Sequence, residues 1–315
     1  MEDILIYLFQ FVNNGLKYTL LKVNKQLNKL KYKDFINDDI SQIIFKHKGY
    51  LNIYLYNHIL KNIKFIKKFD KSFNINQKNV DLSHRKLIHV NLTGLVNIEC
   101  LNIEYNQLQD VILTGLINLK HLRVINNNLL NVDLTGLINL QELFISNNQL
   151  RNFSLTNFIN LKRLNLSYNK LQKIDLMGLA NLQELDLIDN QLQNMDLTGL
   201  FNLQHLYLSN NDLQDIDLTD LVNLQELDIS HNRLKYMNLT SLVNLEELDL
   251  SYNELISIDL TGLINLQSLY LCSNHLQNIS LGGLITLSEL YISRNNLKEK
   301  CIKHIKSLYI PYVLF

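Results

Sequence analysis

The sequence is poor in several residue types and has no excess of charge. Its 315 residues contain one proline, Pro311, one alanine, Ala180, and no tryptophan, and the formal net charge is zero. Abundant Asn, Ile, Lys and Leu accompany these scarcities, a composition typical of an AT-rich genome. With 47% hydrophobic and 19% charged residues, the chain is too apolar to be disordered and long enough for a large core.

Cysteine is scarce as well. The three cysteines, Cys100, Cys272 and Cys301, cannot form an even disulfide framework. A reducing compartment is the simpler interpretation, so we expect an intracellular protein located in the cytoplasm.

Long apolar runs are missing. No stretch approaches the roughly 18 to 20 apolar residues that cross a bilayer. The first letters, MEDILIYLFQFVNN, include an apolar run of about nine residues, but Glu2 and Asp3 stand where a signal peptide needs positive charge. We therefore expect no membrane segment and no export signal.

The main feature that is present is an internal repeat with a 21-residue period. Its apolar residues recur at positions 1, 4, 6, 11, 14, 16 and 19 of each unit. An incomplete unit begins at Leu287. Complete units begin at Gln77, Ile98, Leu119, Leu140, Leu161, Leu182, Leu203, Leu224, Leu245 and Leu266.

Each unit contains the pattern of one short strand. In the unit that begins at Leu245, the apolar Leu248 and Leu250 alternate with polar residues, which predicts a strand over 247–251 with leucines inward. Position 17 is threonine in eight of ten units, a residue that favours a helix N-cap, so a short 3₁₀-like turn should follow.

Asparagine at position 9 marks the turn after the strand. A side-chain amide can satisfy backbone groups where the chain leaves the sheet, and stacked copies would form a ladder. The first unit has Arg85 there, as expected of an atypical terminal repeat. The other units have Asn106, Asn127, Asn148, Asn169, Asn190, Asn211, Asn232, Asn253, Asn274 and Asn295.

One coil buries too few apolar side chains to be stable alone, so the coils must stack into one core. The pattern LxxLxLxxNxLxxIDLTGLxN, found over residues 77–297, resembles the leucine-rich repeat family in a short form. The resemblance implies an α/β repeat fold: a right-handed solenoid with a parallel β-sheet on its concave face and short 3₁₀ turns on its convex face. It also implies a non-enzymatic scaffold that binds protein partners, and we expect a monomer.

The outward strand positions of the middle units are acidic, with tyrosines between them. Duplication of the repeat unit alone would produce such a surface. A binding site for a basic protein would explain it equally well, and both interpretations stay open. The candidate partner-binding residues are Glu184, Asp186, Tyr207, Glu226, Asp228, Glu247, Asp249, Tyr252, Tyr270 and Tyr291.

Catalytic, metal and cofactor sites are not indicated. His205 and His231 lie among serines, but serine at position 7 is a turn residue by default. The sequence Cys301-x-x-His304 is half of a zinc-binding motif, so a terminal cap is the better interpretation. No glycine-rich phosphate-binding loop is present, and an acidic face repels nucleic acid.

Residues 1–76 do not repeat and are basic. Residues 1–78 carry 14 lysines, no arginine and 6 acidic side chains, a net charge of +8 that the remainder balances. The order ILIYLFQFV…LKYTLLKVNKQLNKL is similar to an F-box, and F-box proteins with leucine-rich repeats are substrate-recognition subunits of cullin-RING ubiquitin ligases. The F-box interpretation implies adaptor contacts at Leu5, Leu8, Leu20, Leu21, Val23 and Lys25.

A plain helical cap over the first coil is the alternative for this segment. We therefore expect four parts in the chain. They are a helical, F-box-like segment at 1–45, a helical N-terminal cap or linker at 46–76, repeats at 77–297 and a C-terminal cap at 298–315.

Overall fold

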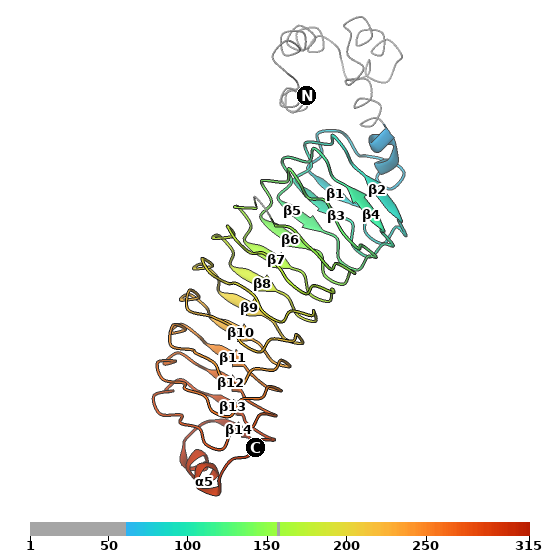
Figure 1. Cartoon of the computed structure of the whole chain (residues 1–315). Coiled ribbons are helices and arrows are strands. Elements are labelled where there is room, and N and C mark those ends of the chain that lie inside the picture. The colour runs from blue at the N-terminus through green and yellow to red at the C-terminus, as the bar shows by residue number, and fades with distance from the viewer. Residues whose placement is uncertain (1–60, 156–157) are drawn as a thin grey trace, which may run out of the picture. The chain divides into compact units, whose positions relative to one another are not determined.

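The computed structural model describes residues 61–155 and 158–315 (Figure 1). The chain divides into two units. The first takes in the residues up to Leu122 together with Asp133–Asn139, and the second comprises Arg123–Val132 and Leu140–Phe315.

In the first unit, each coil carries two short parallel strands. Strand β1 (Asn79–Asp81) pairs with β3 (Cys100–Asn102), and on a second sheet β2 (His89–Asn91) pairs with β4 (Asp110–Ile112). Residues 61–66 are helical, and the side-chain amide of Asn62 donates to the Thr93 carbonyl over 3.1 Å. That contact ties the helical turn to the coil that follows it.

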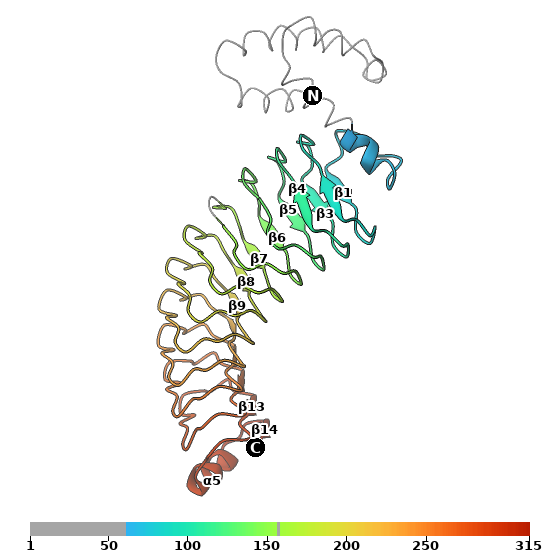
Figure 2. The ribbon, with the colours of Figure 1, turned by 45° about the vertical axis from the view of Figure 1, so that its right-hand side comes forward.

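The second unit stacks one three-residue strand per coil into a parallel sheet (Figures 1 and 2). Each strand pairs with the equivalent strand of the next repeat, so that Leu227 lies beside Leu248. Strand β5 (His121–Arg123) contains the point in the sequence at which the chain passes from the first unit to the second. The later strands are β6 (Glu142–Phe144), β7 (Arg163–Asn165), β8 (Glu184–Asp186), β9 (His205–Tyr207), β10 (Glu226–Asp228), β11 (Glu247–Asp249), β12 (Ser268–Tyr270) and β13 (Glu289–Tyr291).

The core agrees with the repeat pattern, with two differences. Leu248 and Leu250 are fully buried, as predicted. The strand ends at residue 249 instead of 251, because Tyr252 adopts a left-handed backbone (φ 56°) that turns the chain out of the sheet. Position 14 lies at the rim of the core, where Ile258 is only half-buried.

The asparagine ladder at position 9 is confirmed. The buried Asn232 amide donates to the carbonyls of Leu208 and Ile229 over 3.0 and 3.1 Å, and its Oδ1 accepts from the N–H of Leu213 over 3.0 Å. One side chain therefore satisfies backbone groups of its own coil and of the preceding coil.

A second ladder, at position 21, was not predicted. The side-chain amide of Asn223 donates to the Phe201 carbonyl over 2.7 Å, and Asn202, Asn244 and Asn265 make the same bond to the preceding coil. The repeated asparagine of the LxN segment was visible in the sequence, but its partner lies in the preceding coil and could be identified only from the stacking.

The prediction that threonine caps the short turn is wrong about which side chain accepts the hydrogen bonds. Asp217, at position 15, accepts from the N–H and the hydroxyl of Thr219, at position 17, over 2.9 and 2.5 Å. Threonine is thus a donor and the aspartate is the cap. The equivalent aspartates of four coils have lowered pKa values, and the main cause is the side-chain hydrogen bond from threonine. They are Asp133, Asp196, Asp217 and Asp259.

Two single turns return the chain to the next strand. The N–H of Leu242 donates to the carbonyl of Leu239, and the N–H of Leu245 donates to the carbonyl of Leu242, over 3.0 and 3.1 Å. Each such bond joins a residue to the third one before it.

After the last coil, helix α5 (Glu299–Ser307) buries Cys301 and Ile305, and strand β14 (Tyr312–Leu314) pairs in parallel with β13. The three cysteines form no disulfide. Among helices of the described residues, none has the length and apolarity needed to cross a membrane.

Candidate partner-binding surface on the strands

Strands β8 to β13 bring nine of the ten predicted partner-binding residues onto one surface, here called the strand face. It comprises the outward first and third residues of these strands. The tenth residue, Tyr252, lies in the turn after β11, where its ring stacks on His231 with centroids 4.1 Å apart.

Two glutamates on the strand face accept hydrogen bonds from tyrosine hydroxyls. Tyr207 donates to Glu226 Oε2 over 2.5 Å, and Tyr270 donates to Glu289 Oε2 over 3.3 Å. Burial first, and then the nearby glutamates, raise the pKa of both tyrosines, so each remains a neutral donor. These diagonal pairs join β9 to β10 and β12 to β13.

An acidic centre, defined as Asp228, Glu247 and Asp249, lies between the two tyrosine–glutamate pairs. Asp228 and Asp249 stand side by side in the register of β10 and β11, and Glu247 stands beside Glu226. Burial is the main cause that raises the pKa of Glu247 and Asp249, and neighbouring carboxylates add to it. Among the described residues, the carboxylate of Glu247 has no hydrogen-bond or ion-pair partner.

The two aspartates of the acidic centre also have a structural role that the sequence did not reveal. Asp228 Oδ1 accepts from the N–H and hydroxyl of Ser230 over 3.0 and 2.7 Å, and Asp249 Oδ1 accepts from the N–H of Ser251 over 2.8 Å. They hold the turn that ends each strand. Glu247 is therefore the acidic residue of this centre whose charge serves no visible structural purpose.

His205 borders the acidic centre. Its Nδ1 lies 3.3 Å from Glu226 Oε2 but lacks the alignment of a hydrogen bond. Within the described residues, neither His205 nor His231 is hydrogen-bonded to a serine hydroxyl, and no group of three His, Cys, Asp or Glu side chains is placed to hold a metal ion.

Aromatic rings continue the strand face beyond the repeats. Tyr270 on β12 and Tyr291 on β13 stack with centroids 4.8 Å apart, and the ring of Tyr312 on β14 is tilted against Tyr291 with centroids 5.2 Å apart. Tyr312 lies outside the repeat period and was not predicted. The pairing of β14 with β13 places it beside Glu289, from where its ring reaches Tyr291.

Toward β6 and β7 the charges on the strands are mixed. Arg163 forms an ion pair with Glu142, and the guanidinium of Arg123 lies 5.2 Å from the centroid of the Phe144 ring. Among the described residues, acidic charge without an ion-pair partner is therefore found from Glu184 on β8 to the acidic centre on β10 and β11.

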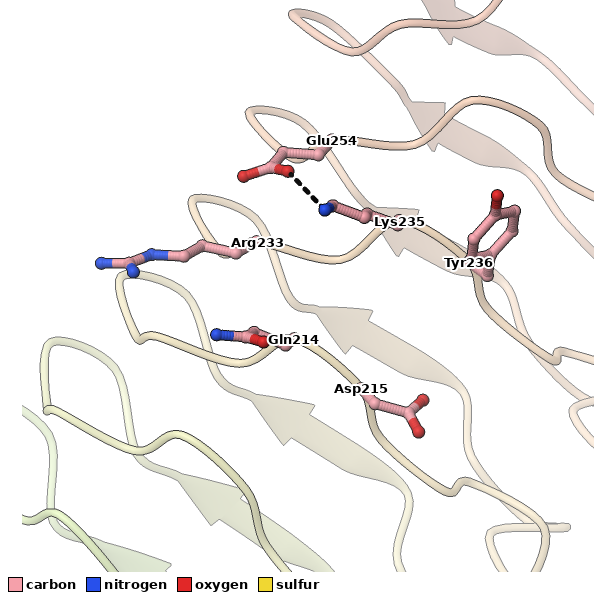
Figure 3. Close-up of a pocket in the computed structure, with 6 residues that line it drawn as sticks. All are labelled: Gln214, Asp215, Arg233, Lys235, Tyr236 and Glu254. Carbon is pink, nitrogen blue, oxygen red and sulfur yellow. Dashed lines mark ion pairs between the residues drawn. The ribbon is translucent and has the colours of Figure 1, made fainter.

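A shallow pocket of about 570 Å³ lies away from the strand face, in the turns that follow the strands (Figure 3). Three of its four charged side chains form ion pairs: Arg233 lies 2.5 Å from Asp212, and Lys235 lies 3.7 Å from Glu254. The fourth, Asp215, accepts from the N–H of Ile216 over 2.9 Å. The pocket is lined by Gln214, Asp215, Arg233, Lys235, Tyr236 and Glu254. We call these turns, positions 8 to 13 of each coil, the strand-end edge.

The predicted adaptor contacts fall outside the described residues. They are Leu5, Leu8, Leu20, Leu21, Val23 and Lys25.

Family models match the middle of the chain. A model described as leucine rich repeat matches residues 139–192, one described as leucine rich repeats in two copies matches 201–242, and a third leucine rich repeat model matches 244–264. No curated protein matches the sequence.

Several solved structures have a similar fold. A leucine-rich-repeat protein of Leptospira interrogans is 25% identical, with a TM-score of 0.55 over 70% of this chain and 73% of that one. The leucine-rich effector YopM of Yersinia pestis is 23% identical, with a TM-score of 0.64 over 79% and 68% of the two chains.

The third similar structure was solved with a bound partner. It is the ectodomain of the plant membrane receptor kinase GASSHO1/SCHENGEN3 of Arabidopsis thaliana, in complex with CASPARIAN STRIP INTEGRITY FACTOR 2. It is 27% identical, with a TM-score of 0.55 over 70% of this chain and 30% of that chain.

Proposed function

Residues 139–264 contain leucine-rich repeats, and from this premise we propose that the chain is a non-enzymatic scaffold that binds a protein partner on its strand face. Leucine-rich-repeat solenoids are typical protein-interaction scaffolds, and they place variable residues on a rigid sheet. The partner we propose presents a basic surface to the acidic centre, inside the cell.

The observation that carries this proposal is the state of Glu247. It is partly desolvated among like charges, and its carboxylate has no cationic partner in the described part of the chain. A lysine or arginine of a partner would remove that repulsion, and the tyrosines on either side supply the aromatic surface that interface hot spots favour.

The test is affinity capture from a cell lysate with the full chain as bait, followed by binding measurements on the recovered protein. Glu247→Lys should weaken binding by more than about tenfold, the range typical of a lost interface charge pair. Glu299→Lys on α5 is the control, because it makes the same charge change on an exposed helix. Asp228 and Asp249 are poorer choices, since they also hold turns.

Salt gives a second readout. Exposed charges are screened within about 8 to 10 Å at physiological ionic strength, so added salt should weaken the complex. If the Glu247→Lys and Glu299→Lys chains bind with equal affinity, or if the affinity does not change with salt concentration, the partner uses another surface.

A second candidate function is that of an F-box-type recognition subunit of a cullin-RING ligase. The observation that favours it is the helical pattern of residues 1–45, together with the net charge of +8 over residues 1–78. Capture with the full chain should recover a ligase adaptor, and Leu21→Asp should lose that adaptor while Leu21→Met keeps it. If the unsubstituted chain recovers no adaptor, the F-box interpretation of residues 1–45 is wrong and the segment is a cap.

A further inference from the structure

The outward residues of β5 to β7 show how this sheet holds an arginine. The guanidinium of Arg123 on β5 lies 5.2 Å from the centroid of the Phe144 ring on the neighbouring strand β6. Arg163 on β7 forms an ion pair with Glu142, its partner in the register of β6 and β7. An outward arginine on this sheet therefore has two kinds of neighbour, an aromatic ring and a carboxylate.

Strands β11 and β12 present the same two kinds of neighbour without an arginine (Figure 1). Glu247 and Asp249 on β11 stand beside Ser268 and Tyr270 on β12, and we call these four residues the β11–β12 seat. None of the outward first and third residues of β8 to β13 is an arginine or a lysine. The cation that would complete the arrangement is therefore not supplied by the strand face itself.

The ring of Tyr270 turns one face toward β11. Tyr291 on β13 covers the opposite face, with centroids 4.8 Å apart and the two ring planes 21° apart. Because rings stacked on successive strands have their faces directed along the stack, the second face of Tyr270 is on the side of Glu247 and Asp249. Among the described residues, no aromatic ring or cation covers that second face.

Ser268 leaves room for a side chain of a partner. It is the smallest outward residue of β8 to β13, and it lies between Glu247 and Glu289 in the register of the strands. Since adjacent strands lie about 4.8 Å apart, the backbones of the two glutamates are about 10 Å apart across the serine. Glu289 accepts from the Tyr270 hydroxyl over 3.3 Å, so Glu247 is the carboxylate that is left to receive a cation.

Arginine gains more than lysine from such surroundings. Both side chains are attracted to a carboxylate by their charge. A guanidinium is also planar and weakly hydrated, stacks on aromatic rings and donates two parallel hydrogen bonds to one carboxylate. An ammonium is a compact and strongly hydrated charge without that geometry. The ring face of Tyr270 and the carboxylate of Glu247 are the two features that distinguish the two cations.

We propose that the strand face selects arginine over lysine, with an arginine of the partner in the β11–β12 seat. Its guanidinium stacks on the second face of Tyr270 and donates to the carboxylate of Glu247, and Ser268 leaves the space for it. Asp249 adds attraction while it continues to hold its turn. This inference rests on the proposed function and narrows the basic partner to a protein with an exposed arginine-rich segment.

Oligo-arginine and oligo-lysine peptides of equal length and charge test the preference. Calorimetric titration of the full chain at one salt concentration should give an affinity about threefold to tenfold higher for oligo-arginine, the range expected of a guanidinium over an aromatic ring. Equal affinities that Glu247→Lys weakens alike would overturn the arginine preference and leave the proposed function intact. If neither peptide binds, both proposals are wrong.

Two substitutions of Tyr270 separate this seat from a general preference of carboxylates for arginine. Tyr270→Leu and Tyr270→Phe both remove the hydroxyl, but only leucine removes the ring. The ratio of the two peptide affinities should fall below about twofold in Tyr270→Leu and persist in Tyr270→Phe. Tyr236→Leu is the control, because Tyr236 is 65% exposed at the strand-end edge. A ratio that persists in Tyr270→Leu would overturn the proposal.

Ser268→Arg fills the seat from within the chain. It places an arginine beside Glu247 as Arg163 stands beside Glu142. The affinity for oligo-arginine should then fall more than about tenfold, because the seat is occupied and its carboxylate is paired. Ser257→Arg adds the same charge at an exposed position of the strand-end edge. Equal losses in these two variants would mean that oligo-arginine does not use the β11–β12 seat, and would overturn the proposal.

Discussion

At the scale of single residues, the asparagine at position 9 is the most connected polar side chain of a coil. The buried side chain of Asn232 donates to three carbonyls and accepts from one N–H, in its own coil and in the preceding one. Asn232→Ala should lower the free energy of unfolding by about 2 to 4 kcal/mol, because several buried backbone groups lose their partner at about 1 to 3 kcal/mol each. Urea denaturation measures this loss.

Asn223→Ala in the second ladder is the matched control. Its exposed amide makes one bond, to the Phe201 carbonyl, which water can replace, so the expected loss is about 0.5 to 1 kcal/mol. Equal losses at the two positions would contradict the different roles assigned to the ladders.

The carboxylate of Glu247 should make stability depend on pH. Its pKa is raised in the folded state, so its contribution to stability is fully present below the unfolded pKa of about 4.3 and is lost as the pH rises through the folded value. Glu247→Gln should therefore stabilise the fold at pH 7, by no more than about 0.5 kcal/mol for so exposed a group, and have no such effect at pH 4. Urea unfolding at both pH values compares the two chains.

At the scale of one coil, backbone conformation decides which residues the turns accept. Gly283 has φ 93°, a left-handed conformation that favours glycine. Its neighbour Gly282 does not have a positive φ of this kind, and a Cβ atom there would lie 3.8 Å from Ser280 Oγ. Gly283→Ala should cost about 1 to 2 kcal/mol of unfolding free energy. Gly282→Ala should be neutral or stabilise by about 0.4 to 1 kcal/mol. Thermal unfolding of the two variants would show similar shifts if turn conformation were unimportant.

The predictions for a coil succeeded for the core and for the asparagine at position 9, and failed for the cap at position 17. Alternation around Leu248 and Leu250 located the strand, because burial follows directly from the spacing of apolar residues. The cap was assigned to threonine instead of Asp217, because both residues suit a turn and only the geometry shows which oxygen accepts.

At the scale of the whole molecule, residues 298–315 should protect the last coil of the second unit. Ile305 of α5 is fully buried, Ile302 is half-buried, and β14 pairs with the edge of β13. Ile305→Ala should lower the unfolding free energy by about 2 to 4 kcal/mol, and Ile302→Ala by much less. Each coil depends on its neighbours, so we expect the unfolding midpoint of the entire stack to fall with Ile305→Ala. An unchanged midpoint would mean that α5 does not support the repeats.

The sequence by itself determined the coil, its strand, its inward leucines and the pairing of neighbouring strands. The physical reason is that a constant repeat period places each residue beside its equivalent in the next coil, as Glu226 and Glu247 show. The acidic residues of the candidate surface could be named for the same reason.

Only the tertiary structure decided which polar groups are satisfied and which are left over. Tyr207 donates to Glu226 across a diagonal, Tyr312 contacts the Tyr291 ring from outside the repeat, and the Glu247 carboxylate has no partner among the described residues. Repetition fixes the spacing of side chains, but hydrogen bonds depend on rotamers and on distances between coils. Apart from the asparagine ladder at position 9, the periodic pattern does not contain that information.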